Sequence, residues 1–290
     1  MDMMVAVDLA DGPETVMAHA LAWASRLGAT IHLRSVSHLL GDPAQLFGDI
    51  DTATLAQEWA RCRASEASAL ERLSSKIPHR LRGSNELLVG PPGATLSSVA
   101  SGFDLLLLGT HGRTGLKRLF LGSVAERVVR EANAPVLVVH LDGDPPPEDR
   151  ALKVMAPLDA SEIDLRPLQL AREWLGPDTA LHVVYALADL RLYEEIGLLR
   201  DQTREHPHRE WAEHQLSTAL AEAGIEAEQH YTSSFTANPG GELAEVAAAL
   251  EVDLVTMPTH GRRGLQHLAY GSVAERLVRS SPCATLIVRG

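Results

Sequence analysis

The chain contains the same stretch twice, with the same spacing and no gap. Residues 110–127 read T-H-G-R-T-G-L-K-R-L-F-L-G-S-V-A-E-R, and residues 259–276 read T-H-G-R-R-G-L-Q-H-L-A-Y-G-S-V-A-E-R. A short apolar run precedes each copy, at 103–108 and at 252–257. Such runs are typical of parallel strands that are buried on both faces. A duplicated strand, glycine-bearing loop and helix indicates two copies of one α/β domain.

The loop in each copy ends at a glycine and a serine, where the following helix is expected to begin. The backbone N–H groups at a helix N-terminus lack intrahelical partners, and the positive end of the helix dipole favours an anion there. Glycine has no Cβ, so an anion can approach the backbone closely. In the first copy Arg113, Lys117 and Arg118 supply positive charge nearby. We therefore expect this loop to hold a phosphate group.

The pattern G-x-x-G, nine residues and then G-S, between a fourth strand and the next helix, resembles the ATP-binding signature of the universal stress protein family. The resemblance covers nearly the whole chain as two tandem copies. It implies ATP as the ligand, with or without Mg²⁺. It also implies contacts from a residue after the first strand and from the residue after the histidine of the second strand. The implied ATP-binding positions are Asp8, Leu33, Gly109, Gly112, Arg113, Gly122, Ser123 and Val124 in the first copy and Asp159, Val183, Gly261, Gly271, Ser272 and Val273 in the second.

The second copy departs from this signature at its first glycine, where Pro258 stands in place of Gly109. Proline has no N–H to donate and its φ is fixed near −65°. We therefore expect the second site to bind ATP more weakly than the first.

The pattern of apolar runs predicts an α/β fold. Strands are expected at 3–7, 31–36, 85–89, 103–108 and 136–140, and again at 152–157, 181–184, 225–231, 252–257 and 284–288, with helices between them and a long helical segment over 190–223. Right-handed crossovers then give two tandem doubly wound, Rossmann-like domains, each a five-stranded parallel sheet of order 3-2-1-4-5. The polar, proline-rich residues 142–150 predict a linker between domain 1 (1–141) and domain 2 (151–290).

Ligands of doubly wound sheets collect at the carboxyl ends of the strands, where the direction of the crossovers reverses. Asp8 and Gly109 are expected at that edge. A carboxylate there can accept a hydrogen bond from a ribose hydroxyl or an adenine amine, or hold a metal ion on the phosphates. Asp8 could instead cap the turn that follows the strand.

Composition narrows the classes of partner. The net charge is −12, with 38 acidic against 26 basic side chains, which argues against nucleic acid or an anionic membrane as the main partner. No run is apolar for about 18 residues, so no membrane span is expected, and we expect a cytoplasmic protein without a signal peptide. The two cysteines, Cys62 and Cys283, lie in different copies and are expected to be inert thiols, buried or half-buried.

The resemblance implies an ATP-binding regulator of the stress response, whose nucleotide acts as a ligand switch. Two alternatives stay open: a slow ATP hydrolase or phosphotransferase, and a nucleotide-free interaction scaffold. There is no Walker loop, and His111 and His260 have no evident partner acid, so no catalytic residue is expected. No metal site is expected either, because an exposed helix start explains the histidines and glutamates of 205–214.

The family resemblance also implies that the two copies pair as a pseudo-dimer through 136–140 and 284–288. A homodimer and an unknown protein partner remain open.

Overall fold

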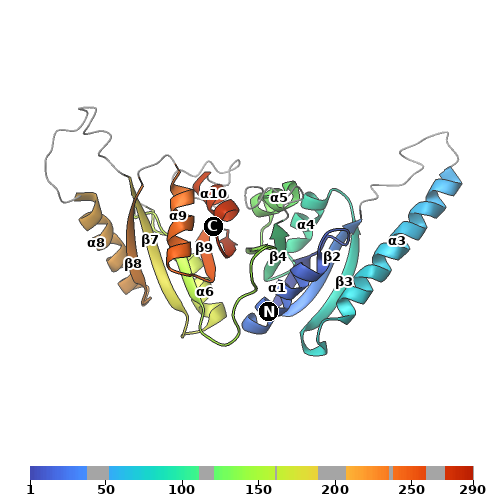
Figure 1. Ribbon diagram of the computed structural model, residues 1–290, viewed down its shortest axis with the longest axis horizontal. Helices are drawn as coiled ribbons and strands as arrows, with labels where there is room; N and C mark the ends of the chain where they lie inside the picture. Colours follow the sequence, from blue (N-terminus) through green and yellow to red (C-terminus); the bar gives the residue numbers. More distant parts are fainter. Residues whose placement is uncertain are drawn as a thin grey trace. The chain divides into compact units, whose positions relative to one another are not determined.

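The computed structural model describes residues 1–37, 52–110, 121–160, 162–188, 207–234, 238–258 and 272–289. These ranges leave out residues 111–120 and 259–271, which are most of the two glycine-bearing loops. The chain forms two compact units, Met1–Glu148 and Asp149–Gly290 (Figure 1). The predicted domain ends, at 141 and 151, stay a prediction.

The first unit is a parallel sheet of five strands. These are β1 (Asp2–Ala6), β2 (Thr30–Ser37), β3 (Arg82–Val89), β4 (Leu105–Thr110) and β5 (Val136–His140). Their order is β3-β2-β1-β4-β5, and every neighbouring pair is parallel. The predicted order 3-2-1-4-5 is confirmed. β3 begins earlier than predicted because polar residues such as Arg82 and Ser84 can occupy the outermost strand of a sheet.

The second unit repeats this topology. Its strands are β6 (Lys153–Pro157), β7 (Ala180–Ala188), β8 (Glu228–Ser234), β9 (Leu254–Pro258) and β10 (Ala284–Val288). The order, β8-β7-β6-β9-β10, is the same as that of the first unit, and all of the pairs are again parallel.

The helices of the first unit connect these strands (Figure 1). They are α1 (Pro13–Leu27), α3 (Thr52–Ser75), α4 (Pro92–Ala100) and α5 (Ser123–Glu131), with a 3-10 turn η1 (His79–Leu81) before β3. The crossovers through α1 and α3 run away from β1 in one direction, and those through α4 and α5 run in the other. Right-handed connections therefore place the two pairs of helices on opposite faces of the sheet. The helices of the second unit are α6 (Arg166–Leu175), α8 (Pro207–Glu222), α9 (Pro239–Ala249) and α10 (Ser272–Ser280).

Local sequence explains where the helices begin and end. α1 ends at Gly28, whose left-handed φ of 60° suits glycine and whose N–H donates to the carbonyl of Ala24, as the sequence predicts. α9 begins after Asn238, whose side chain accepts a hydrogen bond from the N–H of Gly241 at 3.2 Å. The predicted long helical segment over 190–223 is observed as α8 from Pro207 onward, and residues 189–206 lie outside the described part of the chain.

The apolar runs form the core of each unit. Met3, Met4 and Val5 of β1 and Leu105 to Leu107 of β4 are fully buried, as are Val154 and Met155 of β6. Burying each of these large side chains contributes about 1.5–3 kcal/mol. The central strands are therefore the most strongly held part of the unit, and they fix the positions of the residues just beyond their carboxyl ends.

The cysteines differ from the expectation in one case. Cys62 is exposed on α3, because it lies on the solvent side of a helix that covers only the outer strands. Cys283 is half-buried, and burial raises the pKa of its thiol to about 12. Among the described residues, no helix is both long and apolar enough to cross a membrane.

Candidate functional site

The centre of each sheet is the point where the direction of the crossovers reverses. In the first unit β1 pairs with both β2 and β4, with Ala6 level with Arg34 on one side and with Leu108 on the other. The N–H of Val7 still donates to the carbonyl of Arg34 at 2.9 Å, so the sheet continues to Val7. Asp8 comes directly after it. The structure thus places Asp8 at the carboxyl edge of the sheet, between the two directions of winding.

The Asp8 carboxylate also holds its own turn. Its Oδ1 accepts a hydrogen bond from the N–H of Ala10 at 2.9 Å, and its carbonyl accepts one from the N–H of Asp11 at 3.3 Å. The turn-capping role considered from the sequence is therefore present. An ionised carboxylate has about four lone-pair sites, so this hydrogen bond is compatible with others. Half-buried at the edge, Asp8 can hold the turn and accept from a ligand as well.

The start of α5 has an unusual glycine. Gly122 is the N-cap, with φ −57° and ψ 151°, and its carbonyl accepts from the N–H of Glu126 at 2.9 Å. This φ is open to any residue. A Cβ built on Gly122 would meet no atom within 4 Å in the part of the chain that the structure describes. Ser123 and Val124 come next and are exposed. Neither the backbone nor the described packing requires a glycine here.

Gly109, by contrast, is explained by packing. It lies in β4, level with Val139 of β5. A Cβ on Gly109 would stand 2.8 Å from Cδ2 of Leu141, too close for any real contact. The missing Cβ of Gly109 therefore makes room for Leu141, and any contribution of Gly109 to a ligand comes from its backbone.

Leu33 and Val183 are not level with the acidic residues of the carboxyl edge, and their contact with ATP stays a prediction. Leu33 is fully buried in the middle of β2, level with Val5, and its carbonyl accepts from the guanidinium of Arg34 at 2.9 Å. The preceding His32 contacts Asp2, the first residue of β1, at 3.2 Å, so this histidine marks the amino edge of the sheet. Val183 is likewise fully buried.

The strand register identifies a residue at the carboxyl edge that the sequence pattern did not reveal. Two residues beyond the last pair of β1 and β2, the same register puts Val36 level with Asp8. In the second unit, Ala186 is correspondingly level with Asp159. Val36 and Ala186 could have been found from the residues that pair with the strand before each acidic residue. The histidine of the second strand was a poor landmark, because it lies toward the amino edge.

The second unit keeps part of this arrangement. Leu158 donates its N–H to the carbonyl of Val184 at 3.0 Å, and Asp159 comes next, with its carbonyl accepting from the N–H of Glu162 at 3.0 Å. Pro258 is the last residue of β9, level with Val288 of β10. α10 begins at Ser272, and Val273 is exposed. The remaining predicted residues, Gly112, Arg113, Gly261 and Gly271, lie outside the described residues.

In the second unit a close contact between helices sets the position of the start of α10. A Cβ on Gly240 of α9 would stand 2.6 Å from the carbonyl oxygen of Val273. Asn238, the N-cap of α9, also accepts from Nη1 of Arg276 in α10 at 3.1 Å. The first turns of α9 and α10 are therefore locked together.

The histidines and glutamates near the start of α8 do not form a described cluster. Glu213 pairs with Arg209 at 2.7 Å, Glu210 and His214 are exposed, and Glu205 and His206 lie outside the described ranges.

Comparison with known proteins agrees with the fold and the duplication. A universal stress protein of Mycobacterium tuberculosis, Rv2005c, is 26% identical over 217 residues, which cover 72% of this chain and 70% of that protein. The universal stress protein MJ0531 of Methanocaldococcus jannaschii is 32% identical over 142 residues, 47% of this chain and 80% of that protein. The crystal structure of a universal stress protein from Archaeoglobus fulgidus has the same fold, with a TM-score of 0.68 and 18% identity over 99% of this chain and 98% of its own. The model of the universal stress protein family matches residues 1–140 and again 151–289, so this chain belongs to that family.

Proposed function

We propose that this chain binds ATP at the carboxyl edge of its first unit and uses the bound nucleotide as a ligand switch in a stress response. The observation that carries this proposal is Gly122, a helix N-cap whose glycine neither φ nor the described packing demands. A nucleotide phosphate that approaches the backbone at this point gives the residue a reason to lack a Cβ.

The start of α5 has the electrostatics that a phosphate needs. The N–H groups of the first turn have no partners inside the helix, and the dipole adds partial positive charge to them. This matters in a chain of net charge −12, where an anion needs a local attraction. Each charge-assisted hydrogen bond to a phosphate oxygen would contribute about 1.5–3 kcal/mol.

Asp8 complements this helix start. It is fixed by β1 and by its own turn at the same edge of the sheet. Its carboxylate suits a ribose hydroxyl, an adenine amine or a Mg²⁺ ion on the phosphates. We propose that Asp8 and the start of α5 bind the same nucleotide.

The test is calorimetric titration of ATP into the full-length chain and into Gly122→Val. The added Cβ is compatible with φ −57° and meets no described atom within 4 Å, so the variant should fold, with a loss of about 1 kcal/mol because valine is a poorer N-cap than glycine. A branched Cβ at the phosphate should weaken the first site by about tenfold or more, the equivalent of losing one charge-assisted hydrogen bond. Unchanged ATP affinity in the folded variant would refute the assignment.

Gly102→Ala is the matched control. This glycine precedes β4, on the opposite edge of the same sheet, and a Cβ there makes only an ordinary contact, 3.5 Å from the carbonyl oxygen of Val99. ATP binding should not change in this variant. A loss as large as that of Gly122→Val would mean that any glycine replacement in the unit disturbs binding.

The nucleotide that copurifies with the protein separates a switch from an enzyme. Intact ATP that persists through hours of incubation supports a ligand role. Conversion to ADP by wild type but not by Gly122→Val would establish hydrolysis at this site instead.

A further inference from the structure

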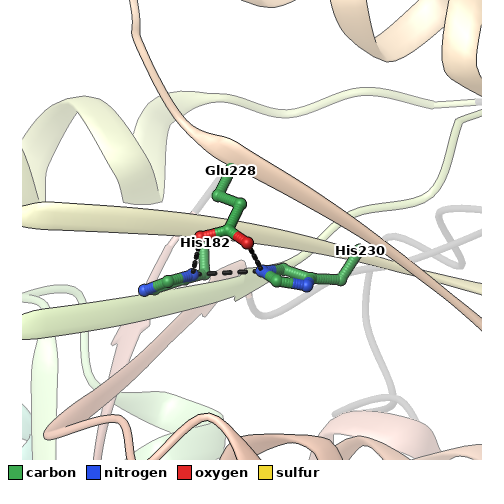
Figure 2. Close-up of side chains that lie close together, drawn as sticks. All are labelled: His182, Glu228 and His230. Atoms are coloured by element: carbon green, nitrogen blue, oxygen red, sulfur yellow. Dashed lines mark hydrogen bonds and ion pairs between the residues drawn. The ribbon is translucent and has the colours of Figure 1, made fainter.

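Three side chains of the second unit converge on two neighbouring strands of its sheet. His182 lies on β7, and Glu228 and His230 lie on the neighbouring edge strand β8. His182 is level with Glu228, and Val184 with His230, so the three residues share one face of the sheet. Figure 2 shows both imidazole rings and the carboxylate pointing toward one another.

The distances between the three groups are those of ligands around one ion. Nδ1 of His182 is 3.1 Å from Nε2 of His230 and 3.5 Å from Oε2 of Glu228, and Nε2 of His230 is 3.8 Å from Oε1 of Glu228. Ligand atoms about 2.0–2.1 Å from a tetrahedral zinc ion are about 3.3 Å apart. A shift of a few tenths of an ångström would bring all three groups to that spacing.

The surroundings of His182 favour its neutral imidazole form. Burial lowers the pKa of His182, and the neighbouring His230 and Lys153 lower it too, while Glu228 opposes them. His182 is only 9% exposed, whereas the side chain of Glu228 is 68% exposed and can adjust its position. A neutral imidazole is the form that binds a metal. Two imidazole nitrogens at 3.1 Å must otherwise share a proton.

The first unit has a histidine, His32, at the same position, and both of its ring nitrogens contact protein groups. His32 is level with Met4 of β1, just as His182 is level with Met155 of β6. Nδ1 of His32 contacts Oγ of Ser84 at 2.9 Å, and its Nε2 contacts a carboxylate at the start of β1 at 3.2 Å. The duplicated histidine therefore occupies the same place in both units, with a carboxylate beside it in each, but among the described residues only His182 also has a second imidazole within reach.

We propose that Nδ1 of His182, Nε2 of His230 and the Glu228 carboxylate form a binding site for a divalent transition metal of the zinc class. Two imidazoles and one carboxylate suit zinc, nickel or copper and do not suit magnesium or calcium, which prefer all-oxygen ligands. Three protein ligands leave a fourth position for water or an outside ligand. The site is independent of the proposed nucleotide function.

The test uses Zn²⁺ and the full-length chain, with affinity measured by competition against a chromophoric chelator. Glu228→Gln and His230→Gln change only exposed or half-buried side chains, so both variants should fold. Each should weaken Zn²⁺ binding at least about tenfold, since even the outer-shell partners of metal ligands are worth about 10–100-fold. Co²⁺ bound to the wild type should give the intense visible bands of tetrahedral coordination, and both variants should lose them.

Two controls replace histidines that lie outside the proposed metal site. His32→Gln removes the duplicate of His182, and His214→Gln removes an exposed histidine of α8. Neither should alter Zn²⁺ affinity. The proposal is overturned if wild type binds no Zn²⁺ below millimolar concentration, or if His230→Gln binds it as tightly as wild type. It is also overturned if Co²⁺ gives the weak absorption bands of octahedral coordination. The contact between the two imidazoles would then be explained by a proton that they share.

Discussion

Replacing Gly240 by alanine should destabilise the second unit, although alanine is the better helix former. The added Cβ would stand 2.6 Å from the carbonyl oxygen of Val273, 2.7 Å from Cβ of Arg276 and 3.1 Å from the backbone nitrogen of Leu277. Two of these atoms are backbone, so α10 itself would have to move. Overpacking of this kind costs about 1–3 kcal/mol, and the gain in helix propensity offsets at most about 1 kcal/mol. We expect a net loss of about 1–2 kcal/mol.

The corresponding residue of the first unit provides the control. Gly93 occupies the same place at the start of α4, but the three atoms nearest to a Cβ there all belong to the side chain of Arg127, with its Cβ and Cδ each at 2.9 Å. Cδ can move away by a change of rotamer, whereas Cβ requires a small shift of α5, so Gly93→Ala should cost about 1 kcal/mol, less than Gly240→Ala.

Urea unfolding of both variants, followed by circular dichroism, measures the difference. Displacement of α10 should also weaken ATP binding at the second unit, because the start of this helix is part of the proposed second site. The reasoning is refuted if Gly240→Ala is as stable as wild type, or if Gly93→Ala loses the greater stability.

Single features of the chain support three further predictions. Pro258→Gly, made in the Gly122→Val background so that the first site is weakened, should raise the ATP affinity of the second site about two- to tenfold in calorimetry, because it restores one N–H donor worth about 0.5–1.5 kcal/mol. Unchanged affinity would show that Pro258 is not what weakens the second site. Iodoacetamide at pH 8 should label the exposed Cys62 and leave Cys283 unmodified, as measured by mass spectrometry. The thiolate is the reactive form, and burial raises the pKa of Cys283 to about 12, so equal labelling would contradict that burial. The family resemblance implies that β5 and β10 pair within one chain. In that case the amides of both strands should exchange slowly with deuterium. Fast exchange of alternate amides along both strands would mean that each is an open edge.

The strands could be predicted because their residues are buried on both faces. A run such as Leu105 to Leu108 has no polar position, and only a strand between two layers of helices buries such a run completely. The topology was then obtained from right-handed crossovers, and the carboxyl edge from the topology. By this reasoning alone Asp8 and Gly109 were expected at that edge, and they lie just after β1 and near the end of β4.

The positions of Leu33 and Val183 could not be obtained in the same way. The sequence shows where a strand lies but not its register, and a slip of three residues moves a position by about 10 Å along the sheet. His32 was used as the landmark for the edge, yet it contacts Asp2 at the other end of the strands.

The cluster of His182, Glu228 and His230 was missed for a related reason. His182 and His230 are 48 residues apart in sequence, and only the pairing of β7 with β8 brings them together. Glu228 and His230 alone, two residues apart on a polar edge strand, look like ordinary solvent-facing residues.

Hydrogen exchange of the full-length chain with and without saturating ATP locates the nucleotide most directly. ATP bound at the carboxyl edge should slow exchange in the turn after Asp8 and in the first turn of α5 from Gly122, with little change at the amino edge that carries Asp2 and His32. Protection confined to that amino edge, or no protection at either edge, would show that ATP does not bind at the carboxyl edge.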